Sequence, residues 1–228
     1  RHRPEHPAQL RGLDGTRFAF TAPEGRGRVA IRHIGEYQVH NALAALATGL
    51  ALGIPLATVV AGIEAAPDVP GRFELVDAGQ DFRVVVDYAH KPDALERLLR
   101  GGRELGPRRL IVVFGCGGDR DRGKRPQMGR LAQELADVAV VTSDNPRSED
   151  PAAIIDAILA GCGGDGGAEI VVEPDRARAI RAAIAMAASG DLVLIAGKGH
   201  ETYQLTAAGR IDFDDREHAR AALLARCG

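Results

Sequence analysis

The sequence is poor in cysteine, and this argues against two kinds of small protein. The 228 residues contain three cysteines, Cys116, Cys162 and Cys227. Their number is odd, and no two of them have the C-x-x-C spacing of a zinc-binding pair. A fold held together by disulfides or by structural zinc is therefore not expected. So few cysteines fit a reducing compartment, and we expect a cytoplasmic protein.

Long apolar runs and a large net charge are also missing. No apolar stretch approaches the roughly 18 residues of a membrane helix, so we expect no membrane partner. The net charge is −2, which disfavours recognition of a phosphate backbone, and we expect no nucleic-acid partner. No signal peptide is visible, and the chain begins at Arg1 rather than Met, as expected if its natural start lies upstream.

The sequence does contain an apolar core and a repeated alternation of strand and helix. Hydrophobic residues make up 45% of the chain, enough for a folded domain. The predicted strands of this part cover residues 83–86, 110–114, 138–141, 170–172 and 192–195. The predicted helices cover residues 92–105, 126–136, 150–161, 175–188 and 214–226. Continuously apolar strands that alternate with helices predict an α/β fold with a mostly parallel sheet covered on both faces.

The first 70 residues have a different pattern. Two strands are predicted at 16–21 and 28–32, followed by helices at 41–52 and 56–65. The first of these helices consists almost entirely of Ala and Leu, and a helix that is apolar on most sides must be buried. Two short strands cannot bury it. We therefore expect residues 1–69 to be the tail of a larger domain whose beginning is absent, with a boundary at Pro67–Gly71 and a second domain over 70–228.

Polar clusters follow the predicted strands, where an open α/β sheet binds its ligands. These clusters are Asp87–His90, Gly115–Asp121, Ser143–Arg147, Glu173–Arg176 and Gly197–Glu201. Each of them alone is typical of turn and capping chemistry. Five at the same edge of one sheet indicate a shared binding site.

The segment Gly118–Lys124 nearly matches a P-loop, but we reject that interpretation. Arg125 stands where a P-loop needs a Ser or Thr hydroxyl for Mg²⁺. Four charged residues between the glycines also suit a backbone phosphate cradle poorly. The cations of this segment, Arg120, Arg122, Lys124 and Arg125, suit an anionic ligand. A solvated charged loop is the equal alternative.

Two other clusters suit the two charges of an amino acid. Ser143–Arg147 offers an amide and a guanidinium on a proline-stiffened turn, and arginine matches a carboxylate bidentately. In Gly197–Glu201 the glycines allow close backbone approach, and Glu201 can receive an ammonium group. The alternatives are an Asx-turn before a helix and a flexible loop. Cys116 is interpreted as a small buried residue rather than a nucleophile.

Taken together, the motifs of the chain resemble those of the Mur ligase family. The residues that carry the resemblance are Gly71-Arg72, Asp87–His90, Gly115–Pro126, Ser143–Pro151, Ala196–Glu201 and Asp212–Glu217. The form Asp144-Asn145-Pro146-Arg147 resembles the branch that adds meso-diaminopimelate to UDP-N-acetylmuramoyl-L-alanyl-D-glutamate in peptidoglycan synthesis. The resemblance implies a Rossmann-like C-terminal ligase domain over 70–228, preceded over 1–69 by the end of the family's central ATP-binding domain.

The resemblance also implies the reaction and its cofactors. In this family ATP with Mg²⁺ phosphorylates a substrate carboxylate, and an amine then attacks the acyl phosphate to form an amide. The family's P-loop, its metal ligands and its UDP-binding domain precede the part that this chain matches. We therefore expect no metal ligand in residues 1–228 and assign no particular residue a catalytic role; the chain alone should not catalyse ligation. The upstream domains are the expected partners, with ATP, meso-diaminopimelate and the UDP-linked dipeptide as substrates.

The family's binding residues carry over to matching positions. The amino-acid site would consist of Arg120, Asp144, Asn145, Pro146, Arg147, Gly197 and Glu201, and the nucleotide contacts would be Asn41, Arg72, Asp87, His90 and Lys124. Diaminopimelate has an amino-acid group at each end. Two arginines and one glutamate therefore suit its far end, whereas lysine has only one carboxylate and fits less well.

Two alternatives remain open at this point. A related amide ligase such as folylpolyglutamate synthetase shares the fold. A non-catalytic module that binds an amino acid or a nucleotide would retain the same pocket without the reaction.

Overall fold

A computed structural model describes residues 9–10, 15–32, 36–163 and 167–227. By their internal contacts, the residues form two compact units, Arg1–Val69 and Pro70–Gly228. Each unit has its own apolar core. The two are therefore described one at a time.

The first unit is a small antiparallel sheet packed against two helices. Its elements are β1 (Gln9–Leu10), β2 (Thr16–Ala22), β3 (Gly25–Ile31), α1 (Glu36–Ala51) and α2 (Leu56–Glu64). Strand β2 alternates buried and exposed residues, so that Phe18 and Phe20 face the helices. Helix α1 buries only a stripe that includes Ala42 and Leu46. The expected burial on most sides is thus not found, because Ala44, Ala45 and Ala47 are exposed.

The second unit is built on a six-stranded sheet with the order β4-β5-β9-β6-β7-β8. Only the edge strand β4 (Glu74–Leu75) is antiparallel to its neighbour. The parallel strands are β5 (Arg83–Asp87), β6 (Leu110–Phe114), β7 (Val138–Val141), β8 (Glu169–Val172) and β9 (Leu192–Ala196). All five predicted strands are confirmed, β6 and β7 with the predicted ends.

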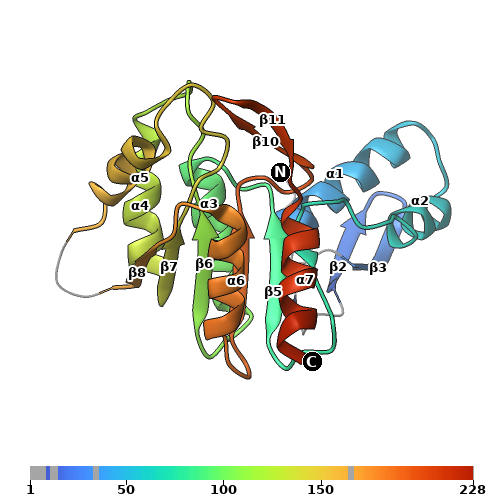
Figure 1. The fold of residues 1–228 in the computed structure, drawn as a ribbon. Coiled ribbons are helices and arrows are strands. Elements are labelled where there is room, and N and C mark those ends of the chain that lie inside the picture. Colours follow the sequence, from blue (N-terminus) through green and yellow to red (C-terminus); the bar gives the residue numbers. More distant parts are fainter. Residues whose placement is uncertain (1–8, 11–14, 33–35, 164–166, 228) are drawn as a thin grey trace. The chain divides into compact units, whose positions relative to one another are not determined.

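Helices cover both faces of this sheet, as Figure 1 shows. They are α3 (Pro92–Glu104), α4 (Lys124–Leu135), α5 (Pro151–Leu159), α6 (Arg176–Met186) and α7 (Asp215–Cys227). One core lies between the sheet and α3, α4 and α5, and the other lies between the sheet and α6 and α7. The predicted α/β fold with both faces covered is confirmed. Among the helices that the structure describes, none is long and apolar enough to cross a membrane.

Local chemistry accounts for the helix starts. The Asp150 side chain accepts a hydrogen bond from Ala152 N at 3.0 Å, and Asp175 accepts one from Arg178 N at 2.8 Å. Both residues are N-caps, as their types predict. Helix α4 begins two residues before the predicted start at Pro126. Proline is tolerated at the third residue of the helix because the N–H group that it lacks would have no partner within the first turn.

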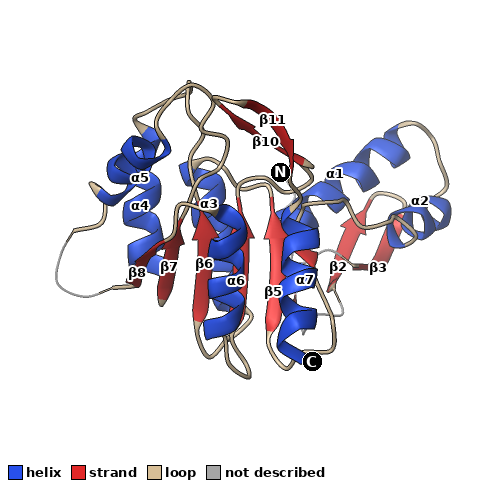
Figure 2. Cartoon of the chain, viewed as in Figure 1, coloured by secondary structure: helices blue, strands red, loops and turns tan. Residues whose placement is uncertain are grey.

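The sequence pattern missed a hairpin that lies at the C-terminal end of the sheet. Strands β10 (Tyr203–Thr206) and β11 (Gly209–Asp212) pair antiparallel there (Figure 2). Strand β11 is exposed along its whole length, so it has no apolar alternation to reveal it. The sequence did offer one signal, Gly209, which follows the two-residue connection between the strands. Its φ of 117° is a backbone conformation that favours glycine.

Helices α4 and α5 approach so closely that a glycine is required between them, which gives a stability prediction. A Cβ at Gly129 would lie 2.1 Å from the carbonyl oxygen of Ile158. We expect Gly129→Ala to lower the free energy of unfolding by about 1–3 kcal/mol, because backbone must move to admit the methyl group. Urea denaturation measures the change.

Gly101 in α3 is the matched control, because its Cβ would meet nothing within 4 Å. Gly101→Ala should leave the free energy of unfolding unchanged or raise it by up to about 1 kcal/mol, since alanine has less conformational freedom than glycine in the unfolded chain. Equal losses in the two variants would contradict the close-packing explanation.

Candidate functional site

Three loops converge at the C-terminal end of the sheet in the second unit. They follow β6, β7 and β9, and we call residues 115–123 the β6 loop, 142–150 the β7 loop and 197–202 the β9 loop. These strands are parallel, so the loops that follow them start at the same edge (Figure 2). The loops carry most of the polar residues that the sequence singled out.

Glycines bring the β6 and β7 loops into direct backbone contact. A Cβ at Gly118 would lie 1.9 Å from the carbonyl oxygen of Pro146, and a Cβ at Gly115 would lie 2.2 Å from that of Thr142. Gly118 N donates a hydrogen bond to the Asn145 carbonyl at 2.9 Å. These glycines thus serve the contact between two loops.

The β9-loop glycines also face protein atoms, in contrast to the ligand approach suggested by the sequence. A Cβ at Gly197 would lie 2.6 Å from Asp144 Oδ2, and one at Gly199 would lie 2.7 Å from Tyr88 Cβ. Both glycines have positive φ values, 122° and 54°. Their freedom is therefore used to pack the β9 loop against its neighbours.

The Asn145 side chain joins the β7 loop to the β9 loop. It is 4% exposed, and its Nδ2 donates to Glu201 Oε2 at 2.9 Å. Its Oδ1 accepts from Lys198 Nζ at 3.1 Å and from Leu205 N in the hairpin at 2.9 Å. Two donors on Oδ1 fix the amide orientation, so one Nδ2 hydrogen points to Glu201.

Glu201 has a buried cationic partner that the sequence analysis did not assign. Lys198 Nζ lies 3.2 Å from Glu201 Oε2, and the Lys198 side chain is 0% exposed. The Glu201 side chain is 18% exposed. In the contacts that the structure describes, only Oε2 of Glu201 is engaged, so Oε1 is available to a ligand. The sequence signal for this pair was a lysine between two glycines, directly after a continuously apolar strand.

Arg147 and Arg120 flank the same glycine. Arg147 Nη1 donates to the carbonyls of Gly118 at 2.9 Å and Asn145 at 3.3 Å, while Arg120 Nη1 donates to Asp119 O at 3.0 Å. A Cβ at Gly117 would lie 2.9 Å from Arg147 Nη1 and 3.8 Å from Arg120 Cγ. Arg120 Cγ and the Arg147 guanidinium thus both lie near Gly117. Among the described contacts, Nη2 and Nε of Arg147 are unengaged.

Asp144 and Pro146 are buried and shape the β7 loop. Asp144 Oδ1 accepts from Asn145 N at 2.7 Å, and its carbonyl accepts from Gln204 Nε2 at 2.6 Å. The Pro146 carbonyl accepts from Glu149 N at 3.1 Å. Both residues therefore hold the loop that carries Asn145.

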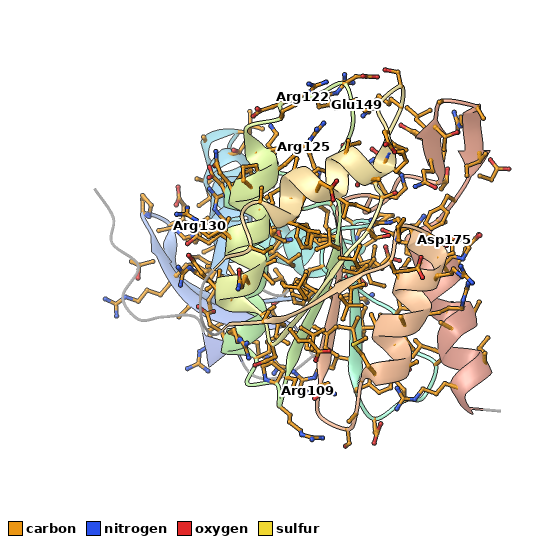
Figure 3. The ribbon with its side chains drawn as sticks, turned by 60° about the vertical axis from the view of Figure 1, so that its left-hand side comes forward. Arg109, Arg122, Arg125, Arg130, Glu149 and Asp175 are labelled. Atoms are coloured by element: carbon orange, nitrogen blue, oxygen red, sulfur yellow. The ribbon has the colours of Figure 1, made fainter. Side chains whose placement is uncertain are left out.

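The charged part of the β6 loop is anchored by one glutamate. Arg125 is 2% exposed, and its two terminal nitrogens bind Glu149 at 2.8 and 3.1 Å. Arg122 Nη2 lies 3.2 Å from the same carboxylate, and Figure 3 shows the three side chains together. Lys124 Nζ donates to the His90 carbonyl at 2.7 Å. The prediction that Arg125 helps to hold an anionic ligand is therefore wrong, because Glu149 already compensates the charge of Arg125.

The nucleotide candidates Arg72 and His90 meet around one tyrosine. The Arg72 guanidinium lies over the Tyr88 ring at 4.7 Å. The same ring lies 4.5 Å from the His90 ring and 5.1 Å from the His200 ring. Tyr88 and His200 were not among the predicted contacts. Together these residues form an aromatic and cationic surface patch.

Asp87 and Asn41 have partners within the protein. The Asp87 carboxylate accepts from Phe73 N and from Ala89 N, each at 2.8 Å, and so holds the turn after β5. Burial raises the pKa of Asp87, although both backbone N–H groups oppose this shift. Asn41 lies on α1 in the first unit, where its Nδ2 donates to Gln38 Oε1 at 3.0 Å.

In the part of the chain that the structure describes, no group of three or more His, Cys, Asp or Glu side chains is placed to hold a metal ion. We therefore assign no magnesium ligand here.

Cys116 is 1% exposed, and burial raises the pKa of its thiol to about 12. The interpretation of Cys116 as a small buried residue is confirmed.

The fold and the site define an α/β domain that presents charged loops at the carboxyl edge of a parallel sheet, a class that binds small ligands there. Residues 71–199 match the family described as Mur ligase, glutamate ligase domain. The chain belongs to the Mur ligase family, as the motifs indicated.

Two curated relatives have the same name. The UDP-N-acetylmuramoyl-L-alanyl-D-glutamate–2,6-diaminopimelate ligase of Thermosynechococcus vestitus is 53% identical over 215 residues, covering 93% of this chain and 43% of that protein. The ligase of that name from Listeria innocua is 50% identical over 214 residues, covering 94% of this chain and 43% of its own length. The chain therefore covers less than half the length of each of these two relatives.

Solved structures agree with the fold. A UDP-N-acetylmuramoyl-L-alanyl-D-glutamate–2,6-diaminopimelate ligase has a TM-score of 0.70 and 38% identity, with 95% of this chain and 44% of that chain covered. A folylpolyglutamate synthase from Thermotoga maritima has a TM-score of 0.63 and 24% identity, with 84% and 42% covered. The second similarity is one of fold alone.

The glutamate that anchors the β6 loop predicts a pH dependence. The hydrogen bonds from Arg125 lower the pKa of Glu149 to about 2, from an ordinary value of 4.5. A lowered native pKa means that the ion pair stabilises the protein fully above pH 4.5 and loses this contribution as the pH falls towards 2. We expect Glu149→Gln to be less stable at neutral pH and to lose less stability on acidification. Urea unfolding at a series of pH values measures both.

Glu134→Gln is the control, because Glu134 lies 58% exposed on α4 and 3.9 Å from Arg130. This variant should follow the wild-type pH profile. If the Glu149→Gln profile runs parallel to that of the wild type, the pKa of Glu149 is the same in the folded and the unfolded protein, which contradicts the prediction.

Proposed function

We propose that this chain supplies the amino-acid-binding part of an ATP-dependent amide ligase that attaches meso-diaminopimelate to UDP-N-acetylmuramoyl-L-alanyl-D-glutamate. The observation that carries the proposal is the continuous arrangement of Arg147, Asn145 and Glu201, with Arg120 beside it. The names of the relatives support the same substrate. In this proposal the protein acts in the cytoplasm, in peptidoglycan synthesis.

The arrangement matches the far end of diaminopimelate by charge. While one amine of the substrate reacts, the other end presents a carboxylate and an ammonium group. Arg147 and Arg120 suit the carboxylate, because guanidinium N–H groups match its two oxygens. Oε1 of Glu201 suits the ammonium, and the second Nδ2 hydrogen of Asn145 suits a carboxylate oxygen. Lysine lacks the far carboxylate and would leave the arginines without a partner.

The patch around Tyr88 is the proposed nucleotide contact of this unit. Arg72 and Lys124 would attract the phosphates of ATP, and the rings of Tyr88 and His90 offer flat surfaces for its base or sugar. Asp87 would act by holding the turn on which Tyr88 lies. Asn41, on the other unit, remains a proposed adenine contact.

The division of labour between the units is part of the proposal. We assign Pro70–Gly228 to the family's C-terminal domain and Arg1–Val69 to the end of its central ATP-binding domain. ATP would phosphorylate the glutamate carboxylate of the UDP-linked substrate, and the free amine of diaminopimelate would displace phosphate to form the amide. The residues named above bind and orient the amine donor, and Mg²⁺ ligands are assigned to sequence outside this chain.

Binding of the amine donor is the first test. We expect chain 1–228 to bind meso-diaminopimelate in calorimetric titration more tightly than L-lysine. Arg147→Ala should weaken meso-diaminopimelate on the order of tenfold or more, because it removes charge-assisted hydrogen bonds to a carboxylate. Arg130→Ala, an exposed change on α4, is the control and should bind like the wild type. Equal affinities of the Arg147 and Arg130 variants would refute the proposed carboxylate contact.

A chimeric enzyme tests the reaction itself. Chain 1–228 replaces the matched segment of the Thermosynechococcus vestitus relative, which supplies the rest of the protein. We expect ATP-dependent consumption of meso-diaminopimelate, measured by ADP release, and little with L-lysine or L-glutamate. Arg147→Ala in the chimera should lower kcat/KM on the order of tenfold or more, by loss of the same contact. A preference for L-glutamate would point to a folylpolyglutamate-type ligase instead.

A further inference from the structure

Arg176 is a buried arginine with no role in the site described so far. It is the first residue of α6, and its side chain is 0% exposed. Its Nε and Nη2 bind the two carboxylate oxygens of Asp215, the first residue of α7, at 2.7 Å each. Burial opposes the charge of Arg176, but the carboxylates of Asp215, Asp144 and Glu201 together outweigh this effect, and the pKa of Arg176 lies above its usual value. The pair is therefore charged inside the protein.

The remaining donors of Arg176 bind the backbone where the β7 and β9 loops begin. Nη2 donates to the Ala196 carbonyl at 3.0 Å, and Nη1 donates to the Ser143 carbonyl at 3.4 Å. Ala196 ends β9 immediately before Gly197, and Ser143 immediately precedes Asp144. Strand β6 lies between β9 and β7 in the sheet. One guanidinium therefore spans the end of β6 and joins the last residue of β9 to Ser143 in the β7 loop.

These two loops carry the groups that must meet for the proposed function. Asn145 lies two residues after Ser143, and Glu201 lies five residues after Ala196. Their side chains are joined by the 2.9 Å hydrogen bond from Asn145 Nδ2 to Glu201 Oε2. A Cβ at Gly197 would lie 3.8 Å from Arg176 Nη2, so the arginine lies directly behind the β9 loop. Arg176 thus contacts the backbone at the origin of both loops.

We propose that Arg176, held in place by Asp215, is a positioning residue that sets the spacing of the β7 and β9 loops and thereby aligns Asn145 with Glu201 for the amino-acid ligand. The proposal rests on the proposed function, because the ligand is the one named there. Arg176 does not contact this ligand. It acts through two backbone carbonyls.

The chemistry of the pair separates this role from simple stabilisation. A buried ion pair contributes little net stability, because the cost of removing two charges from water offsets their attraction. An apolar pair of similar volume would pack α6 against α7 as well as the ion pair does. An apolar pair cannot donate hydrogen bonds to Ser143 and Ala196. Arginine is therefore needed here for its donors, which fix the loops.

The test compares two double variants of chain 1–228. Arg176→Met with Asp215→Leu removes the donors together with the carboxylate that pairs with them. The control is Arg109→Met with Asp191→Leu, which removes an ion pair that joins the residues just before β6 and β9. Arg109 lies at the opposite end of the sheet from Arg122, Arg125 and Glu149 (Figure 3). Urea unfolding first establishes that both variants fold.

Binding of meso-diaminopimelate is the first readout. We expect the Arg176/Asp215 variant to lose on the order of tenfold or more in affinity, since small misplacements of binding groups are costly. The control should stay within about twofold of the wild type, because it lies at the far end of the sheet. Unchanged affinity in the Arg176/Asp215 variant, or equal losses in both variants, overturns the proposal. If the first double variant does not fold, Arg176→Lys keeps the charge beside Asp215 without the guanidinium fork and should show the same direction of change.

A second readout needs no ligand and separates the two proposals. The side-chain amide signal of Asn145 in ¹H–¹⁵N NMR spectra should shift and exchange faster in the Arg176/Asp215 variant alone. If the wild type binds no meso-diaminopimelate but this signal moves, the proposed function fails and the positioning role stands. If the wild type binds and the signal and affinity do not change, the positioning role fails and the proposed function stands.

Discussion

The candidate site depends on the backbone contact between the β6 and β7 loops. Only glycine at position 118 allows the Pro146 carbonyl to come so near. The contact is closed by hydrogen bonds in both directions, from Gly118 N to the Asn145 carbonyl and from Arg147 Nη1 to the carbonyls of Gly118 and Asn145. Arg147 is thus oriented by backbone rather than by a carboxylate, and its other guanidinium N–H groups are left for a ligand. The positive φ of Arg147, 54°, is the conformational cost of this orientation.

Much of the fold was predictable because burial leaves a strong trace in a sequence. Strands β6 and β7 are buried on both faces, and their continuous apolar runs gave the correct ends. Strand β11 could not be found in this way, because all of its residues are exposed. The two-residue strand β4 is too short to show any period. The start of α4 was placed late because Pro126 is compatible with more than one position in a first turn.

The candidate site was predictable in its location and less so in its partners. Parallel connectivity alone brings the strand ends to one edge, so the location of Asn145, Arg147 and Glu201 at that edge followed from the pattern. Ion-pair partners did not follow, since they depend on approach in space. Arg125 and Glu149 are 24 residues apart, and Arg176 and Asp215 are 39 apart. The charge of a residue in a loop therefore indicates a ligand only after its partners within the protein are known.

Lys198 changes the meaning of Glu201 in the proposed site. A lone carboxylate would attract any ammonium group, including the side chain of lysine. Here the Glu201 carboxylate already accepts from a buried ammonium, and two guanidinium groups lie in the adjoining loops. In the proposed site, a ligand end that carries only a positive charge would share the Glu201 carboxylate with Lys198 and would leave Arg120 and Arg147 without a partner. An end that also carries a carboxylate places its negative charge among those cations and its ammonium at Oε1. We therefore expect Lys198 to favour a zwitterionic group over a simple cation at the proposed site.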